Sequence, residues 1–202
     1  RSALEPLQAA WPFDIRQHGY QIEFVRRGVA GAVVTVPAAD LDARPDGQAP
    51  GVQISLRREI DAQLPRRVSV QYLDAEREYD TGAQYAERLN SSALNETLLD
   101  LPIALTGAEA AGMAEVLLYL AWLNRTEVAF SLPPTYAYLE CADVVNLTTP
   151  EGVLPVLLQA IDYTSDQRLD CKGRPDRPAL YQPAALGGAP ETTGPTTIST
   201  IG

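Results

Sequence analysis

The sequence predicts an α+β fold, mostly antiparallel β in barrel-like or sandwich sheets, with one long packed helix and a short N-terminal helix. Several short segments alternate apolar and polar residues, which is typical of strands with one face toward solvent. The segment from about 107 to 124 has helical periodicity instead, directly after a capping sequence. The 202 residues are 46% hydrophobic and 21% charged, an ordinary composition for a chain with its own core.

Residues 1–44 are expected to form a small subdomain of one helix and two strands. Ser2–Glu5 has the spelling of a capping box, and the helix after it is expected to end near Trp11-Pro12. Alternation then predicts one strand over Tyr20–Val25 and, beyond a turn, a second over Ala32–Val36. The Pro- and Gly-rich segment that follows, up to Gly51, predicts a loop and a domain boundary.

Residues 51–183 are expected to form a larger β-rich module. Alternation predicts its strands at Val52–Arg57, Val68–Tyr72, Leu98–Ile103, Val128–Leu132 and Asp143–Leu147. A closing hairpin is expected from Val153–Tyr163 and Arg168–Lys172. The last segment, 184–202, is rich in Gly, Pro and Thr, which predicts a flexible linker to a following domain.

The long helix is the most clearly marked element. Thr106–Glu109 spells a second capping box, and Glu109 and Arg125 lie near the ends that the helix dipole favours for their charges. Apolar side chains then recur at helical spacing, a pattern more typical of a packed core than of a ligand pocket. These residues are Met113, Val116, Leu117, Leu120 and Leu123.

The net charge of −10 argues against several functions. An acidic surface repels phosphate backbones, so we do not expect specific nucleic-acid binding, although such a surface suits a channel through which DNA slides. The longest apolar stretches, near 116–123 and 152–161, are shorter than the roughly 20 residues of a membrane span. No dinucleotide-binding or phosphate-loop motif occurs, so we expect no cofactor.

The sequence offers few residues for catalysis or metal binding. His18 is the one histidine, and a single histidine excludes multi-histidine zinc sites and argues against a Ser-His-Asp triad. We expect His18 in a polar turn. Cys141 and Cys171 have no second cysteine or histidine close in sequence and are expected to be free thiols. We therefore predict no catalytic, cofactor-binding or metal-binding residues, and no enzymatic activity.

A cluster of carboxylates leaves one alternative open. Asp74, Glu76, Glu78 and Asp80, or Asp143, could supply the acids of a wall-degrading hydrolase. The alternation of the first four favours a solvated strand end or turn, and Asp143 is expected to be a turn residue before a strand.

Aromatic residues leave a second alternative, a carbohydrate-binding domain for host recognition. Tyr136 and Tyr138, close to Pro133-Pro134, could form a sugar-stacking surface together with Trp122. Amphipathic tyrosines at a strand edge or a subunit contact are the more common arrangement.

Short motifs in a fixed order carry a resemblance from Ala3 to about Tyr181. They are Ala3–Leu7, Trp11–Asp14, Gly19–Phe24, Arg27-Gly28, Leu64–Tyr79, Phe130–Pro134, Leu139–Val145 and Pro178–Tyr181. Together they resemble the phage tail-tip family that includes the large "megatron" baseplate proteins of gene transfer agents. This chain has Ala142 where the family usually has glycine before the aspartate, at a tight turn where glycine would serve a positive φ.

The resemblance implies a hub protein of the tail tip or baseplate, in which three copies adapt a hexameric tail tube to a threefold tip. The implied partners are other tail or baseplate proteins and further copies of the chain, and DNA passes nearby without specific binding. The implied location is the virion tail tip, after assembly in the bacterial cytoplasm. No catalytic residue is carried over to this chain.

Overall fold

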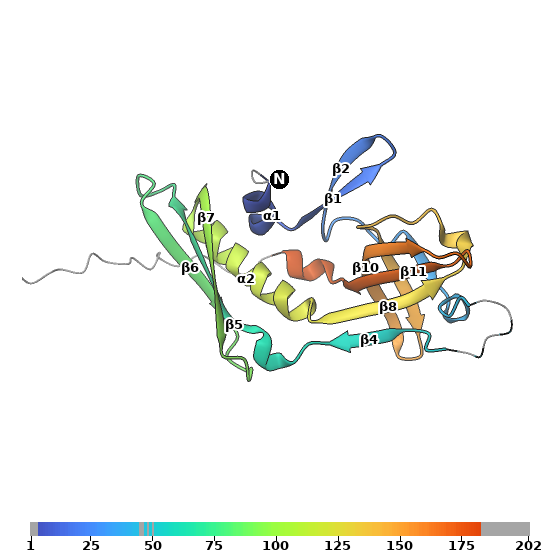
Figure 1. Cartoon of the computed structure of the whole chain (residues 1–202). Helices are drawn as coiled ribbons and strands as arrows, with labels where there is room; N and C mark the ends of the chain where they lie inside the picture. The colour runs from blue at the N-terminus through green and yellow to red at the C-terminus, as the bar shows by residue number, and fades with distance from the viewer. Residues whose placement is uncertain (1–3, 45–46, 48, 50, 183–202) are drawn as a thin grey trace, which may run out of the picture.

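The computed structural model describes residues 4–44, 47, 49 and 51–182, which form two β-sheets, a long helix and a projecting hairpin (Figure 1). The strands are β1 (Phe13–His18), β2 (Gln21–Arg26), β3 (Val34–Val36), β4 (Ser55–Arg58), β5 (Pro65–Asp74), β6 (Thr81–Glu87), β7 (Asn95–Leu105), β8 (Thr126–Leu132), β9 (Val144–Thr149), β10 (Gly152–Tyr163) and β11 (Leu169–Pro175). The helices are α1 (Glu5–Ala10) and α2 (Gly107–Leu123), and the 3-10 helices are η1 (Ala38–Asp40), η2 (Asp61–Gln63), η3 (Pro134–Tyr136) and η4 (Pro178–Tyr181). The predicted α+β class is confirmed, with antiparallel sheets, a short helix and one long helix.

The larger sheet has the strand order β3-β9-β10-β11-β8-β4. All its neighbouring strands are antiparallel except β3 and β9, which run parallel with Val34 opposite Val145. Its inner face and the two short helices η1 and η3 enclose a core that includes Val128, Leu132 and Leu158. Since β3 belongs to this sheet, the sheet contains strands from both of the segments that the sequence divides at residues 45–50.

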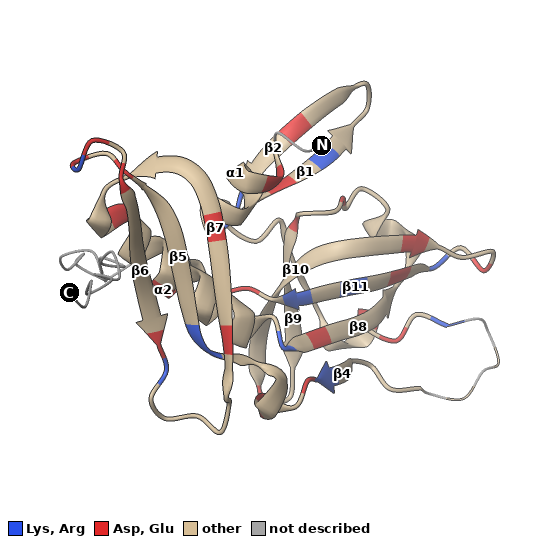
Figure 2. Cartoon of the chain, turned by 60° about the vertical axis from the view of Figure 1, so that its left-hand side comes forward, with Lys and Arg blue, Asp and Glu red and all other residues tan. Residues whose placement is uncertain are grey.

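The smaller sheet has the order β6-β5-β7 and is covered on one face by α2 (Figure 2). β5 pairs antiparallel with β6 and parallel with β7. Val70, Tyr72, Leu101 and Leu105 pack against the helix, which is predominantly apolar and buried on more than one side. Burial of these apolar side chains between sheet and helix stabilises the smaller sheet.

The capping box of α2 forms as the sequence predicts. The Thr106 hydroxyl accepts a hydrogen bond from the Glu109 backbone N–H at 3.3 Å, and the Glu109 carboxylate accepts one from the Thr106 backbone N–H at 2.9 Å. The helix begins at Gly107 and ends at Leu123, within one residue of the predicted bounds.

Several local predictions differ from the structure. His18 ends a strand, β1, where only a turn was expected, and β6 was not foreseen. The strand expected from Val52 begins at Ser55. The predicted cap at Ser2 and the predicted linker 184–202 lie outside the described residues.

Candidate assembly surface

The β1–β2 hairpin has one polar and one apolar face. Ile15 lies opposite Phe24, and Gln17 opposite Ile22, so these side chains share one face; Arg16 lies opposite Glu23 on the other face. Ile22 is 70% exposed and Phe24 is 59% exposed. Because exposed apolar side chains are grouped on a single face, this face is suited to contact another surface.

Ion pairs hold the polar face of the hairpin against the turn before β9. Arg16 Nη1 lies 2.7 Å from Asp143 Oδ1, and Arg16 Nε lies 3.0 Å from Glu23 Oε2. The hydrogen bond to Glu23, with further contributions from Asp143, raises the pKa of Arg16. His18 Nδ1 lies 2.8 Å from Glu140 Oε1. The polar face is therefore directed toward the turn before β9, and these ion pairs do not involve the apolar face.

The turn that receives Arg16 contains Ala142 in a left-handed conformation, with φ of 72°. The Ala142 N–H donates to the Leu158 carbonyl at 2.8 Å, and Asp143 Oδ2 accepts from the Glu140 N–H at 2.9 Å. The turn thus has the positive φ that the sequence associated with glycine, although alanine occupies it.

A second group of contacts fixes the base of the hairpin. Arg27 donates to both carboxylate oxygens of Asp14, at 2.7 and 2.6 Å, and this pairing raises the pKa of Arg27. Gly28, with φ of +74°, lies directly against the Tyr181 ring, so that a Cβ there would be 2.4 Å from Tyr181 Cδ2. The Tyr181 hydroxyl donates to Asp176 Oδ1 at 3.0 Å, and burial raises its pKa. Motifs from both ends of the described chain therefore meet at one point.

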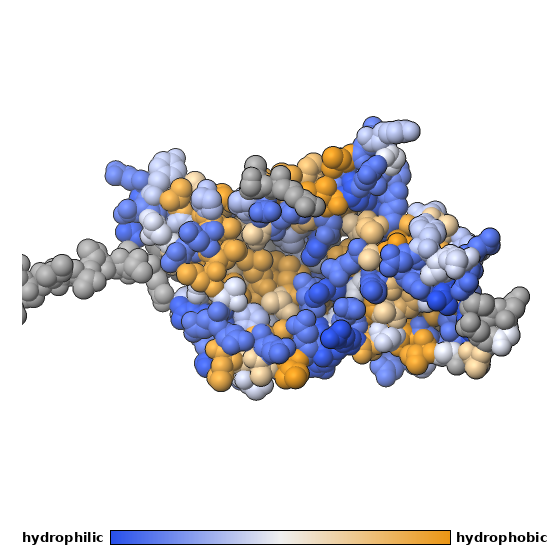
Figure 3. Space-filling view, in the orientation of Figure 1, coloured by the Kyte–Doolittle hydropathy of each residue, from blue (hydrophilic) through white to orange (hydrophobic). Residues whose placement is uncertain are grey.

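A groove of about 540 Å³ lies between the hairpin base, α1 and α2. Its lining is mostly apolar and includes Trp11, Phe13, Phe24, Met113 and Val116. Figure 3 shows hydrophobic residues over α2 below the hairpin, so the apolar hairpin face continues into the groove.

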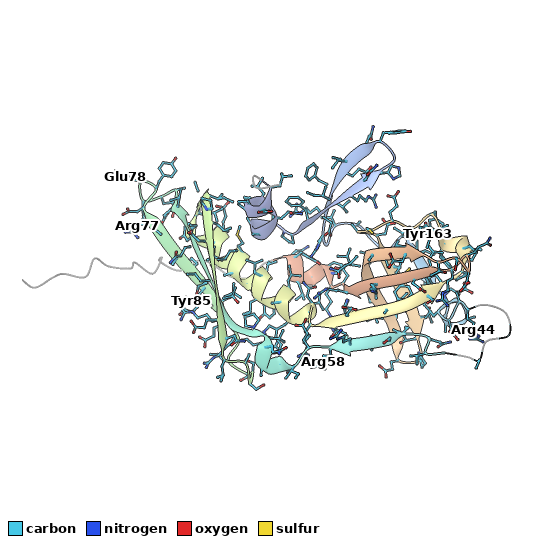
Figure 4. All side chains as sticks on the ribbon, in the orientation of Figure 1. Arg44, Arg58, Arg77, Glu78, Tyr85 and Tyr163 are labelled. Atoms are coloured by element: carbon cyan, nitrogen blue, oxygen red, sulfur yellow. The ribbon has the colours of Figure 1, made fainter. Side chains whose placement is uncertain are left out.

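The clustered acids form a turn. Asp74 is 1% exposed and accepts a hydrogen bond from the Glu76 N–H at 2.9 Å, while Glu76, Glu78 and Asp80 are exposed in the loop between β5 and β6. Figure 4 shows Arg77 and Glu78 at the tip of this loop. Asp143 forms an ion pair with Arg16, and its carboxylate also accepts a hydrogen bond from the Glu140 N–H in its own turn. The preferred interpretation, a solvated strand end or turn, agrees with this arrangement for Glu76, Glu78 and Asp80, whereas Asp74 is buried.

The three aromatic residues considered for sugar binding do not form one surface. Tyr136 is buried in the core of the larger sheet, where its hydroxyl donates to Asp40 Oδ2 at 2.7 Å and burial raises its pKa to about 12. Tyr138 is exposed beside it, with ring centroids 6.4 Å apart. Trp122 belongs to the separate core under the smaller sheet, and its Nε1 donates to the Pro65 carbonyl at 2.9 Å.

The two cysteines are free, Cys141 exposed and Cys171 buried, and burial raises the pKa of Cys171 to about 12. Within the described ranges, no group of three or more His, Cys, Asp or Glu residues could hold a metal ion. No helix in the part of the chain that the structure describes is long and apolar enough to cross a membrane.

Sequence reasoning missed the contacts of Arg16, Glu23 and Arg27 with their partners. A short signal was present, since Phe13–Arg16 alternates apolar and polar residues shortly before Gly19, as the first strand of a hairpin does. The partner Asp143 is 127 residues from Arg16, and no local pattern could have joined the two.

Comparisons with known proteins place the fold in context. The family model described as "Putative phage tail protein" matches residues 1–161. A chain of the structure "Virion of native gene transfer agent (GTA) particle" is similar over 94% of this chain, with a TM-score of 0.81 and 26% identity. This chain covers 42% of that one. A search of curated proteins gives no match.

Two further solved structures share the fold at low identity. The tail protein from Neisseria meningitidis MC58 has a TM-score of 0.55 and 9% identity, covering 87% of this chain and 53% of its own. The 43 kDa tail protein of prophage MuSo2 from Shewanella oneidensis has a TM-score of 0.56 and 10% identity, covering 90% of this chain and 54% of its own. This chain therefore spans about half, or less, of the proteins it resembles. Because the family model matches most of its residues, the chain belongs to this family of phage tail proteins.

Proposed function

We propose that this chain is a structural module of the tail-tip or baseplate hub of a phage or gene-transfer-agent particle. The observation that carries the proposal is the similarity to a chain of the gene-transfer-agent virion, at 26% identity over 94% of this chain. In this proposal the module acts in assembly and has no catalytic role. Its partners are other tail proteins and two further copies of itself.

The exposed apolar hairpin supports a role in assembly. Ile22 and Phe24 would be covered by a neighbouring subunit in the particle, and the ion pairs of Arg16 and Arg27 would hold the hairpin ready for that contact. Pre-ordering of this kind lowers the entropy that association must overcome.

The charge supports a position beside the DNA path. With a net charge of −10, the surface would repel a passing phosphate backbone, so DNA would move along it without specific binding. Cell-surface recognition would belong mainly to other parts of a longer protein, since this chain covers 42% of its virion relative.

The test is electron microscopy of particles whose full-length protein carries a tag inserted after Gly187. We expect tag density at the tail tip with threefold symmetry. Density only on peripheral fibres would instead favour the carbohydrate-binding, host-recognition function, and the absence of the tag from purified particles would refute a place in the tail.

A further inference from the structure

An arginine-lined cleft lies where the C-terminal end of α2 meets the larger sheet. Its volume is about 730 Å³, and its lining includes Arg88, Arg125 and Arg177 beside Tyr119 and Trp122. Figure 2 shows basic and acidic residues side by side where the lower end of the smaller sheet approaches the larger one. Such a concentration of arginines is unexpected in a chain with 16 basic and 26 acidic residues.

The arginines are held in place by the floor of the cleft. The Arg88 guanidinium carbon lies 4.2 Å from the centroid of the Trp122 ring, and that of Arg125 lies 5.3 Å from it. Arg125 Nη1 is also 2.7 Å from Asp61 Oδ1. Stacked arginines lose little further freedom when they bind a carboxylate, and they can do so through two hydrogen bonds.

Asp176, the acidic residue in the cleft lining, already has a hydrogen-bond partner. Asp176 is 3% exposed and accepts the hydrogen bond of the Tyr181 hydroxyl. Arg177, by contrast, is exposed at the rim. Arg125 is paired with Asp61, so the cleft presents the positive charge of Arg88 and Arg177. Trp122 is buried beneath the arginines, whereas Tyr119 is 40% exposed. Positive charge beside an exposed ring suits an acidic segment that also carries an aromatic side chain.

The loop between β5 and β6 has this chemistry. It exposes the carboxylates of Glu76, Glu78 and Asp80, and Tyr79 beside them is 64% exposed. The loop is pre-ordered, because the Asp74 carbonyl accepts hydrogen bonds from the N–H groups of Arg77 and Tyr79 at 3.2 and 2.9 Å.

The loop cannot reach the cleft of its own chain. Trp122, on the cleft floor, donates to Pro65 at the first residue of β5, whereas the acidic loop follows Asp74 at the last. A strand of 10 residues spans about 30 Å at ~3.3 Å per residue. A contact between the two surfaces must therefore join different copies.

We infer that the acidic β5–β6 loop of one copy binds the arginine-lined cleft of the next copy. Loop and cleft are different surfaces, so the contact is head-to-tail, the type of interface that closes into a ring when the rotation between copies permits. The inference rests on the proposed function in one respect, because the ring consists of the copies that the proposed hub would bring together.

A charge exchange in the full-length protein tests the contact. Glu78→Arg and Arg177→Glu each place like charges in the interface, and each is expected to weaken self-association, measured by sedimentation velocity, by about 10-fold or more. The combined Glu78→Arg/Arg177→Glu protein restores opposite charges and is expected to return to within about 3-fold of the parent. Glu151→Arg, an exposed change of the same charge outside both surfaces, is the control and is expected to leave self-association unchanged.

Self-association that is unaffected by either single change, or that is not restored by the combined change, overturns the inference. Binding of a short DNA duplex is measured on the same proteins. If the parent and Glu78→Arg bind the duplex and Arg177→Glu does not, the cleft is a nucleic-acid site instead. The tagged-particle experiment is independent of this one. A tag at the tail tip with no effect of the charge exchange refutes only the contact, whereas a restored charge exchange with no tag in the tail refutes only the proposed location.

Discussion

Replacing Gly28 with alanine tests how strictly the Tyr181 ring constrains the base of the hairpin. The new methyl carbon would lie 2.4 Å from Tyr181 Cδ2 and 2.7 Å from Cγ, in a backbone with φ of +74°. The left-handed conformation costs an alanine about 1–2 kcal/mol. Overlap with a packed ring typically adds about 1–3 kcal/mol. The expected loss in the free energy of unfolding is therefore about 2–5 kcal/mol.

Gly19 provides a matched control in the turn of the same hairpin. Its φ is +58°, but a Cβ there would meet no atom within 4 Å. Gly19→Ala should cost only the backbone component, about 1–2 kcal/mol. In a Tyr181→Ala background the cost of Gly28→Ala should fall toward that level, because the two ring contacts are removed and only the contact with Cβ of residue 181, at 2.9 Å, remains.

Urea unfolding measures these free energies, and hydrogen exchange of the β1–β2 amides shows whether the loss is confined to the hairpin. If Gly28→Ala costs no more than Gly19→Ala, the reasoning from the Tyr181 contact is refuted. An equal cost of Gly28→Ala with and without the Tyr181 ring would refute it as well.

Three further predictions concern a turn, a cap and an ion pair. Ala142→Gly should raise the free energy of unfolding by up to about 1 kcal/mol, because glycine tolerates the φ of 72°; a loss in a urea titration would contradict this. Hydrogen bonds from Thr106 lower the pKa of Glu109 from 4.5, so its stabilising effect is present above that pH and is lost as the pH falls through the lowered value. Glu109→Gln should thus destabilise by roughly 0.5 kcal/mol at pH 7 and by less in acid, and an equal effect in thermal melts at pH 7 and pH 3 would be evidence against it. Arg16→Met should cost about 1 kcal/mol and speed hydrogen exchange in β1 and β2, with a smaller effect when Asp143→Asn is already present; unchanged exchange would exclude a holding role for the pair.

The elements that the sequence predicted best are those whose signal is local. The helix of 107–123 carries its cap and its apolar spacing within one segment, and the apolar–polar alternation from Val68 to Tyr72 lies within β5 alone. β6 was missed because Thr81–Glu87 includes Gly82, Ala83 and Ala86, whose small side chains give no clear apolar period. The parallel pairing of β5 with β7 depends on packing against α2, which no single segment encodes.

The candidate surface was less predictable than the fold. The alternation over Tyr20–Val25 identified the β2 strand, but alternation alone suggests that apolar residues face the core. In the structure, Arg16 and His18 instead take the inner face, because Asp143 and Glu140 lie there. Those acids are more than 120 residues away in sequence, so the orientation of the hairpin depends on tertiary contacts.

The parallel pairing of β3 with β9 has a consequence for synthesis of the chain. Val34 pairs with Val145, so β3 has to wait for about 110 further residues before its partner exists. At ~5–20 residues per second on the ribosome, that delay is roughly 5–20 s. Asp143, which holds the hairpin through Arg16, emerges at the same late point. During this delay the hairpin, with its exposed Ile22 and Phe24, and β3 lack these native contacts, so we expect this segment to be prone to aggregation during synthesis.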